Sequence, residues 1–124
     1  MSKIAWIALA GGLGAVARYG VTGLLQTRTG TGFPWGTFAV NAAGCLVFGF
    51  VLAAAETRLT MSPETRAAIL VGFLGAFTTF STLISETRGL ALDAGLALAG
   101  ANLVGQTLLG FTCLVGGVAL GRLI

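Results

Sequence analysis

The chain has 124 residues, of which 56% are hydrophobic and 9% charged, and it contains no histidine. A soluble domain of this size needs far more polar surface to cover its core, so the composition places the chain in a lipid bilayer. Without histidine, paired carboxylates or a nucleophile beside a base we predict no enzyme, and a net charge of +3 spread over helix ends predicts no nucleic-acid partner.

Four apolar runs follow one another along the chain, joined by short polar segments. Each run is long enough to supply the roughly 20 helical residues that cross a hydrocarbon core about 30 Å thick. The sequence therefore predicts an all-α membrane protein, with residues 1–124 forming a single four-helix transmembrane domain. The spans are expected at roughly 4–25, 33–55, 66–85 and 94–121, and the last connection at 86–93.

Two charged residues lie in or beside the spans, where charge is rare and usually functional. Arg18 in the first span either raises the potential for anions at a pore mouth or extends its side chain to the membrane surface. Glu86, at the end of the third span, either guards an entrance or is simply solvated. Both residues are candidates to line the vestibule of an ion pathway.

Asn41 is the polar residue buried deepest in the second span. It lies about 10 Å inside the helix start, and Thr37 lies one turn before it on the same face. The Asn41 amide either bonds a neighbouring helix or offers its NH₂ group to a passing ion.

The third span is predicted to break between Gly75 and Thr79. Ser62 and Pro63 are typical of a helix start, but glycines and a run of β-branched and hydroxyl residues at 78–82 lower helix propensity and compete for the backbone. A broken helix at membrane depth is tolerated where protein or water covers its free backbone groups. Such breaks bind ions in transporters.

The fourth span carries a polar line formed by Asn102, Gln106 and Gly110, spaced four residues apart. This line either lines a pathway or packs against another helix. The middle of the spans contains hydrogen-bond donors and no acid. The candidate donors are Thr37, Asn41, Thr79, Ser81, Thr82, Asn102 and Gln106.

The basic residues are divided almost evenly between the two membrane faces. One face carries Lys3, Arg58, Arg66 and Arg122, and the other carries Arg18, Arg28 and Arg88. Because lysine and arginine bias sets orientation, four against three predicts that the chain inserts both ways up. Four helices are few to enclose a pathway, so we expect an antiparallel homodimer.

Three motifs then identify a resemblance that covers three of the four spans. GGLGAVARYG at 11–20, PWGTFAVNAAG at 34–44 and GFLGAFTTFST at 72–82 resemble, in order and spacing, the signatures of the Fluc (CrcB-like) fluoride channel family. The resemblance implies a dual-topology antiparallel homodimer in the cell membrane of a prokaryote. Its two passive pathways would release fluoride from the cytoplasm and relieve its toxicity.

The resemblance also implies roles for particular residues. The fluoride pathway would contain Asn41 and Phe80 with the hydroxyls of Thr37, Ser81 and Thr82, and Arg18 would lie near the vestibule. From their positions in the spans, we add Gln106 and Asn102 to the predicted pathway and Glu86 to the predicted vestibule. The backbone carbonyls of Gly75 and Thr78 from both subunits would hold a structural sodium ion at the dimer centre.

Two departures from the family pattern leave alternatives open. Leu83 stands where the family has a second Phe, and Asn102 and Gln106 stand where it commonly has Tyr and Ser. One alternative is therefore a subunit of a heterodimeric fluoride channel. A small dual-topology multidrug or guanidinium exporter would need an acid in the first span, where this chain has Arg18. A third alternative is an assembly subunit that transports nothing.

Overall fold

A computed structural model describes residues 2–57 and 60–123 of the chain. In this part of the chain, four helices are long and apolar enough to cross a membrane: Lys3–Thr29, Trp35–Glu56, Pro63–Asp93 and Leu96–Leu123. The predicted number of spans is confirmed for the described residues, and the protein is a multi-pass membrane protein. Arg58, one of the basic residues counted for orientation, lies outside the described residues.

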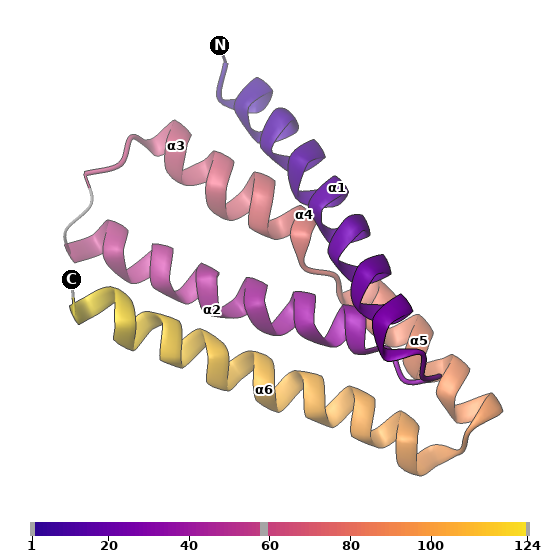
Figure 1. Cartoon of the computed structure of the whole chain (residues 1–124). Coiled ribbons are helices and arrows are strands. Elements are labelled where there is room, and N and C mark those ends of the chain that lie inside the picture. Colours follow the sequence, from indigo (N-terminus) through magenta and orange to yellow (C-terminus); the bar gives the residue numbers. More distant parts are fainter. Residues whose placement is uncertain (1, 58–59, 124) are drawn as a thin grey trace.

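Three of the spans are single helices and the third is interrupted (Figure 1). The single helices are α1 (Lys3–Thr29), α2 (Trp35–Thr57) and α6 (Leu96–Leu123). The third span consists of α3 (Pro63–Ala67), the π-helix η1 (Ala68–Leu74), α4 (Gly75–Phe77) and α5 (Phe80–Asp93). The helices α2 and α6 lie side by side and run in the same direction, and α1 crosses the third span at η1 and α4.

Glycines allow the backbones of α2 and α6 to approach closely. A Cβ atom at Gly117 would collide with the Leu46 carbonyl of α2, and one at Gly49 would collide with the Leu114 carbonyl of α6. Small residues of this kind let helices pack in lipid, where no hydrophobic effect drives them together. The closest packing of the bundle therefore depends on positions without a side chain.

We expect Gly117→Ala to destabilise the fold by about 1–3 kcal/mol, because a methyl group there overpacks a backbone contact that cannot move aside. The thermal unfolding midpoint of the purified protein in detergent measures this loss. Gly116→Ala is the matched control, since its Cβ would meet only Leu46 Cδ1 at 4.0 Å. Equal midpoints for the two variants would contradict the packing argument.

The third span starts and breaks where the sequence predicts. Ser62 accepts a hydrogen bond from the Thr65 N–H at 3.1 Å and so caps the helix before Pro63. After α4 the backbone becomes extended at Thr78 (φ −82°, ψ 157°) and Thr79 (φ −150°, ψ 119°). The preceding π-helix was not predicted; the Gly75 N–H donates to the carbonyls of Leu70 and Gly72.

The predicted connection at 86–93 is wrong, because α5 continues to Asp93. The polar residues at 86–93 therefore indicate that the last turns of the helix leave the apolar part of the membrane, and not that the helix has ended. The helix ends where the N–H groups of Ala94 and Gly95 both donate to the Leu90 carbonyl, and Gly95 adopts a φ of +98° that only glycine tolerates well. The true connection to α6 is Ala94 and Gly95.

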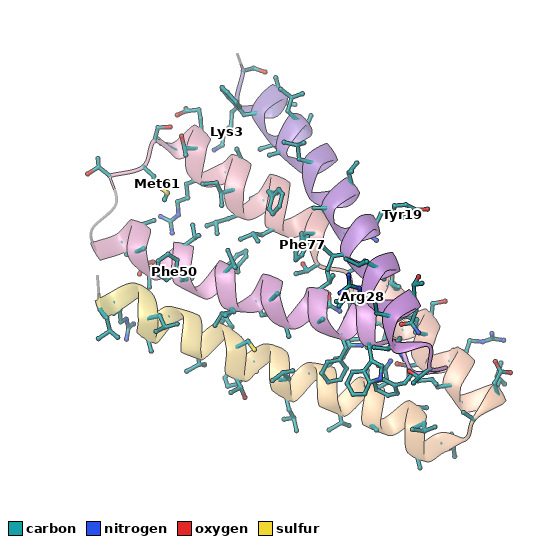
Figure 2. All side chains as sticks on the ribbon, viewed as in Figure 1. Lys3, Tyr19, Arg28, Phe50, Met61 and Phe77 are labelled. Atoms are coloured by element: carbon teal, nitrogen blue, oxygen red, sulfur yellow. The ribbon has the colours of Figure 1, made fainter. Side chains whose placement is uncertain are left out.

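The outer surface of the bundle is apolar. Tyr19 of α1 is 83% exposed and points away from the other helices (Figure 2). Phe33, Trp35 and Phe38 form an aromatic cluster at the start of α2, with ring centroids 4.7 to 6.0 Å apart. Such a cluster suits the interfacial belt of a membrane protein.

Candidate functional site: the break in the third span

The side chain of Asn41 holds the break in the third span through two hydrogen bonds to the backbone of Thr79, which we call the Asn41 clamp. Its Oδ1 accepts the Thr79 N–H at 2.8 Å, and its Nδ2 donates to the Thr79 carbonyl at 3.1 Å. One turn later on α2, Gly44 lets the break approach, since a Cβ there would collide with the Thr78 side chain. A side chain of α2 therefore replaces the Gly75 carbonyl as the partner of the Thr79 N–H, and its NH₂ group adds a donor to the Thr79 carbonyl.

This arrangement frees backbone carbonyls on the α4 side of the break. In a continuous helix the Thr79 N–H would reach the Gly75 carbonyl and the Thr82 N–H would reach the Thr78 carbonyl. Here the Thr79 N–H goes to Asn41, and the Thr82 N–H goes to Thr79 Oγ1 at 3.3 Å. Gly75 and Thr78 thus lose the donors that helix continuation would supply.

Arg18 places a positive charge against the same carbonyl end. Its Nε donates to the Ala76 carbonyl at 3.0 Å, and the side chain is half-buried. The carbonyl end of a helix carries partial negative charge, which a guanidinium offsets. The structure shows Arg18 bonded to the break, and its role at a pore mouth stays a prediction.

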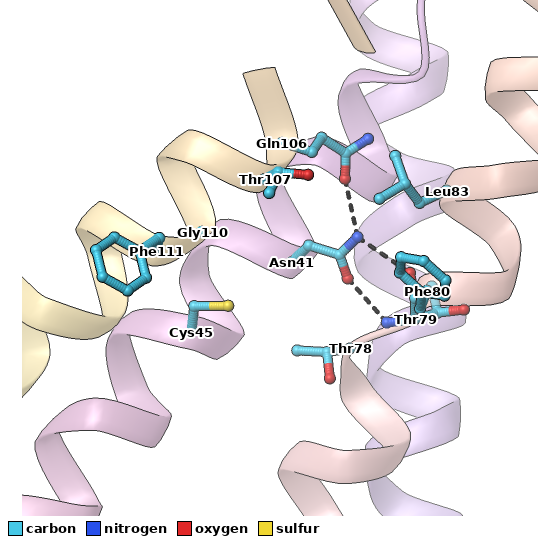
Figure 3. Close-up of a pocket in the computed structure, with 10 residues that line it drawn as sticks. All are labelled: Asn41, Cys45, Thr78, Thr79, Phe80, Leu83, Gln106, Thr107, Gly110 and Phe111. Carbon is cyan, nitrogen blue, oxygen red and sulfur yellow. Dashed lines mark hydrogen bonds between the residues drawn. The ribbon is translucent and has the colours of Figure 1, made fainter. Parts of the chain in front are cut away.

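A cavity of about 300 Å³ opens beside the Asn41 clamp (Figure 3). It combines an amide pair, hydroxyls and aromatic rings, and none of its lining residues carries a formal charge. The lining residues are Asn41, Cys45, Thr78, Thr79, Phe80, Leu83, Gln106, Thr107, Gly110 and Phe111. We call it the break cavity. Phe80 is 72% exposed and sits at the first position of α5.

The polar line of α6 faces the interior. Asn102 is fully buried and Gln106 is 5% exposed. Gln106 Oε1 accepts a hydrogen bond from Asn41 Nδ2 at 2.8 Å, and Gln106 Nε2 donates to Asn102 Oδ1 at 2.8 Å. The three residues of the line share one face as predicted, and that face contacts the clamp.

Arg18, Thr37 and Thr82 line a second cavity of about 300 Å³, which also reaches Thr79. Thr37 is buried, and its hydroxyl donates to Glu86 Oε1 at 2.7 Å. The other carboxylate oxygen of Glu86 is buried and has no hydrogen-bond partner among the described residues.

The structure therefore divides the predicted site residues into groups. Asn41, Phe80 and Gln106 meet at the break cavity, whereas Arg18, Thr37 and Thr82 meet at the second cavity. Ser81 is exposed beside Thr79, with their hydroxyl oxygens 3.4 Å apart, and Asn102 lies behind Gln106.

Sequence reasoning missed Cys45, Thr107 and Phe111 as lining residues of the break cavity. A signal was available in the sequence. Cys45 follows Asn41 by one helical turn, and Thr107 and Phe111 each follow a residue of the α6 polar line by one position.

Comparison with known proteins gives consistent results over almost the whole chain. The family model for CrcB-like protein, Camphor Resistance (CrcB), matches residues 5–118. A protein of Maridesulfovibrio salexigens named fluoride-specific ion channel FluC is 50% identical over 124 residues, which is 100% of this chain and 98% of the relative. Proteins with the same name from Solidesulfovibrio magneticus and Nitrosococcus oceani are 50% and 46% identical, covering 100% and 98% of this chain and 99% and 98% of the relatives.

Proposed function

Because the chain belongs to the CrcB-like family, we propose that it forms a passive channel for fluoride in a prokaryotic inner membrane. The observation that carries the proposal is the break cavity, which joins the Asn41 clamp, threonine hydroxyls and an exposed phenylalanine ring without any formal charge in its lining. The multidrug exporter considered as an alternative does not fit this family.

The chemistry of the break cavity suits a small, strongly hydrated anion. A pore must replace the water around the ion with protein groups that bind it weakly enough for release. Amide N–H groups and hydroxyls donate hydrogen bonds, and the edge of the Phe80 ring carries partial positive charge. A carboxylate in the lining would repel the anion, whereas a lysine or arginine would hold it too firmly.

A passive route is sufficient for fluoride to leave the cell. The neutral acid crosses lipid and dissociates at the higher pH of the cytoplasm, which traps the anion inside. An open channel then lets fluoride leave down its own gradient.

Fluoride efflux from liposomes tests the proposal. Purified protein is reconstituted with internal fluoride, and an electrode follows its release after the counter-ion is allowed to move. We expect rapid fluoride release and no comparable release of chloride under matched conditions. Liposomes with folded protein that release no more fluoride than empty liposomes would exclude the channel function and favour a non-transporting assembly role.

The exposure of the break supports a second subunit. Gly75, Phe80 and Ser81 are exposed on the single chain although they lie in the middle of a membrane span. Free backbone groups at this depth need cover from protein or from a water-filled cavity. A second copy placed against the break provides that cover, and the even charge balance favours an antiparallel copy. Such a dimer has two equivalent sets of cavities and hence two pathways.

We expect both orientations of the chain to coexist in one membrane. A cysteine introduced by Lys3→Cys, in a background with Cys45→Ala and Cys113→Ala, should react with a membrane-impermeant reagent from either face. The fraction labelled before and after permeabilisation gives the share of each orientation. Labelling from one face alone would argue against dual insertion and leave the channel function untouched.

The residues at the break fit a sodium ion. Among the described residues, no group of three or more His, Cys, Asp or Glu could hold a metal, so a cation would need carbonyl ligands. The carbonyls of Gly75 and Thr78 have lost their helical donors, and oxygens of this kind suit a hard cation. A bound sodium ion would supply positive charge to these carbonyls and to the same carbonyls of a second copy.

Sodium depletion should lower fluoride flux. Sodium is replaced on both sides by a large organic cation, with time for exchange, and flux is measured with the same electrode. Thr78→Ser should be mild in the presence of sodium, because the proposed ligand is a backbone carbonyl and serine retains the hydroxyl that donates to the Leu74 carbonyl at 3.0 Å. Full flux after verified depletion would refute a required sodium ion.

A further inference from the structure

Four side chains form a continuous row of hydrogen bonds that starts at the break. Asn41 Nδ2 donates to Gln106 Oε1, and Gln106 Nε2 donates to Asn102 Oδ1, both at 2.8 Å. Asn102 Nδ2 then donates to Thr87 Oγ1 at 2.9 Å, and the Thr87 hydroxyl donates to the Leu83 carbonyl at 2.7 Å. We call Asn41, Gln106, Asn102 and Thr87 the amide ladder.

The backbone of Thr79 sets the direction of the amide ladder. It offers one donor and one acceptor to Asn41, so the Asn41 amide has a single orientation. Gln106 must then turn its oxygen toward Asn41, because two NH₂ groups cannot bond each other. Asn102 must likewise turn its oxygen toward the NH₂ group of Gln106. Every hydrogen bond between members of the ladder is therefore donated in the direction away from the break, while the second Asn41 hydrogen goes to the Thr79 carbonyl.

This direction limits what the break cavity offers to an anion. Both hydrogens of the Asn41 NH₂ group are donated, one to Thr79 and one to Gln106. Asn41 and Gln106 both line the cavity, and Gln106 presents an oxygen to the shared bond (Figure 3). An anion that takes the Asn41 hydrogen must therefore displace the Gln106 carbonyl.

We propose that Gln106 determines specificity by rotating its amide half a turn when the anion arrives. The rotation exchanges Oε1 for Nε2 beside Asn41, so that the anion receives one N–H from each of two amides. This inference rests on the proposed fluoride function. Fluoride is a stronger hydrogen-bond acceptor than chloride, so it compensates best for the bond that Gln106 and Asn41 give up.

Asn102 and Thr87 allow the rotation without leaving a buried polar group that lacks a hydrogen-bond partner. When Gln106 turns its oxygen to Asn102, Asn102 rotates to present its NH₂ group. The Thr87 hydroxyl can donate as well as accept, so it then donates to Asn102 Oδ1. The amide ladder runs in the opposite direction with each member bonded, which matters because Asn102 is fully buried.

Side-chain nitrogen labelling tests the rotation directly. The chain has only two glutamines, Gln26 and Gln106, so ¹⁵Nε2-glutamine gives two assignable amide signals in solid-state NMR of proteoliposomes. Sodium fluoride should shift the Gln106 signal and produce a ¹⁵N–¹⁹F dipolar coupling, whereas sodium chloride should do neither. Gln26 is the internal reference, because its Nε2 donates to the carbonyls of Thr31 and Phe33.

Two substitutions of Asn102 separate rotation from simple packing. The carboxylate introduced by Asn102→Asp can only accept, so it holds the Gln106 NH₂ group and should raise the fluoride concentration for half-maximal shift about tenfold. Asn102→Leu removes the acceptor for that NH₂ group and should leave this concentration unchanged or lower it. If Asn102 only filled space, both substitutions would raise the fluoride concentration for half-maximal shift.

A fluoride coupling at the Asn41 amide without one at Gln106 Nε2 would overturn the rotation and leave the fluoride channel standing. Equal weakening by both Asn102 substitutions would also overturn it. If neither variant assembles, the presence or absence of the ¹⁵N–¹⁹F coupling at Gln106 in the wild-type protein still tests the rotation. Absence of any fluoride coupling together with absence of flux would instead refute the proposed function.

Discussion

Asn41→Asp should abolish fluoride flux without preventing dimer assembly. The carboxylate would stand in the lining of the break cavity, where two like charges about 4 Å apart repel by about 4 kcal/mol at an effective dielectric constant near 20. That penalty corresponds to about a thousandfold loss. The new carboxylate would also face the Thr79 carbonyl and Gln106 Oε1, which now receive hydrogen bonds from Asn41.

Flux is measured with the fluoride electrode on protein that size-exclusion chromatography shows to be dimeric. Gln26→Glu makes the same amide-to-acid change near the end of α1, where Gln26 lines the second cavity and not the break cavity, and it should reduce flux less than Asn41→Asp does. If Asn41→Asp dimers conduct within tenfold of the wild type, the anion does not pass the break cavity.

Phe80→Leu should reduce flux about tenfold, because leucine lacks the polarised ring edge that attracts an anion. Phe80 is 72% exposed on the single chain, so the substitution should affect the folding of the chain little. The electrode assay on dimeric protein measures the loss.

Phe111→Leu is the matched comparison. Phe111 is 69% exposed and lines the same cavity, but it lies away from the Asn41 clamp (Figure 3). Its loss should reduce flux less than that of Phe80. Leu83→Phe, which restores the family pattern in the same lining, should keep or raise flux. Equal flux in wild type and Phe80→Leu would mean that the ring is not part of the pathway.

The transmembrane architecture could be predicted from composition, because a helix that crosses lipid must be long and apolar whatever it packs against. The end of α5 could not, since polar residues at 86–93 are compatible with both a loop and a helix that leaves the membrane. Only the backbone conformation at Gly95 decides where that helix stops. The pairing of two subunits and the sodium ion stay predictions.

The sequence by itself determined that the third span breaks near Gly75 to Thr79, since local propensity falls there, and that Asn102 and Gln106 share a face with Gly110. Only the tertiary structure decided what these groups bind. Thr79 pairs with Asn41, 38 residues away, and Gln106 bonds Asn41 across the α2–α6 contact. Periodicity fixes which face of a helix a side chain occupies, but the partner of a buried amide depends on how close the neighbouring helices can approach.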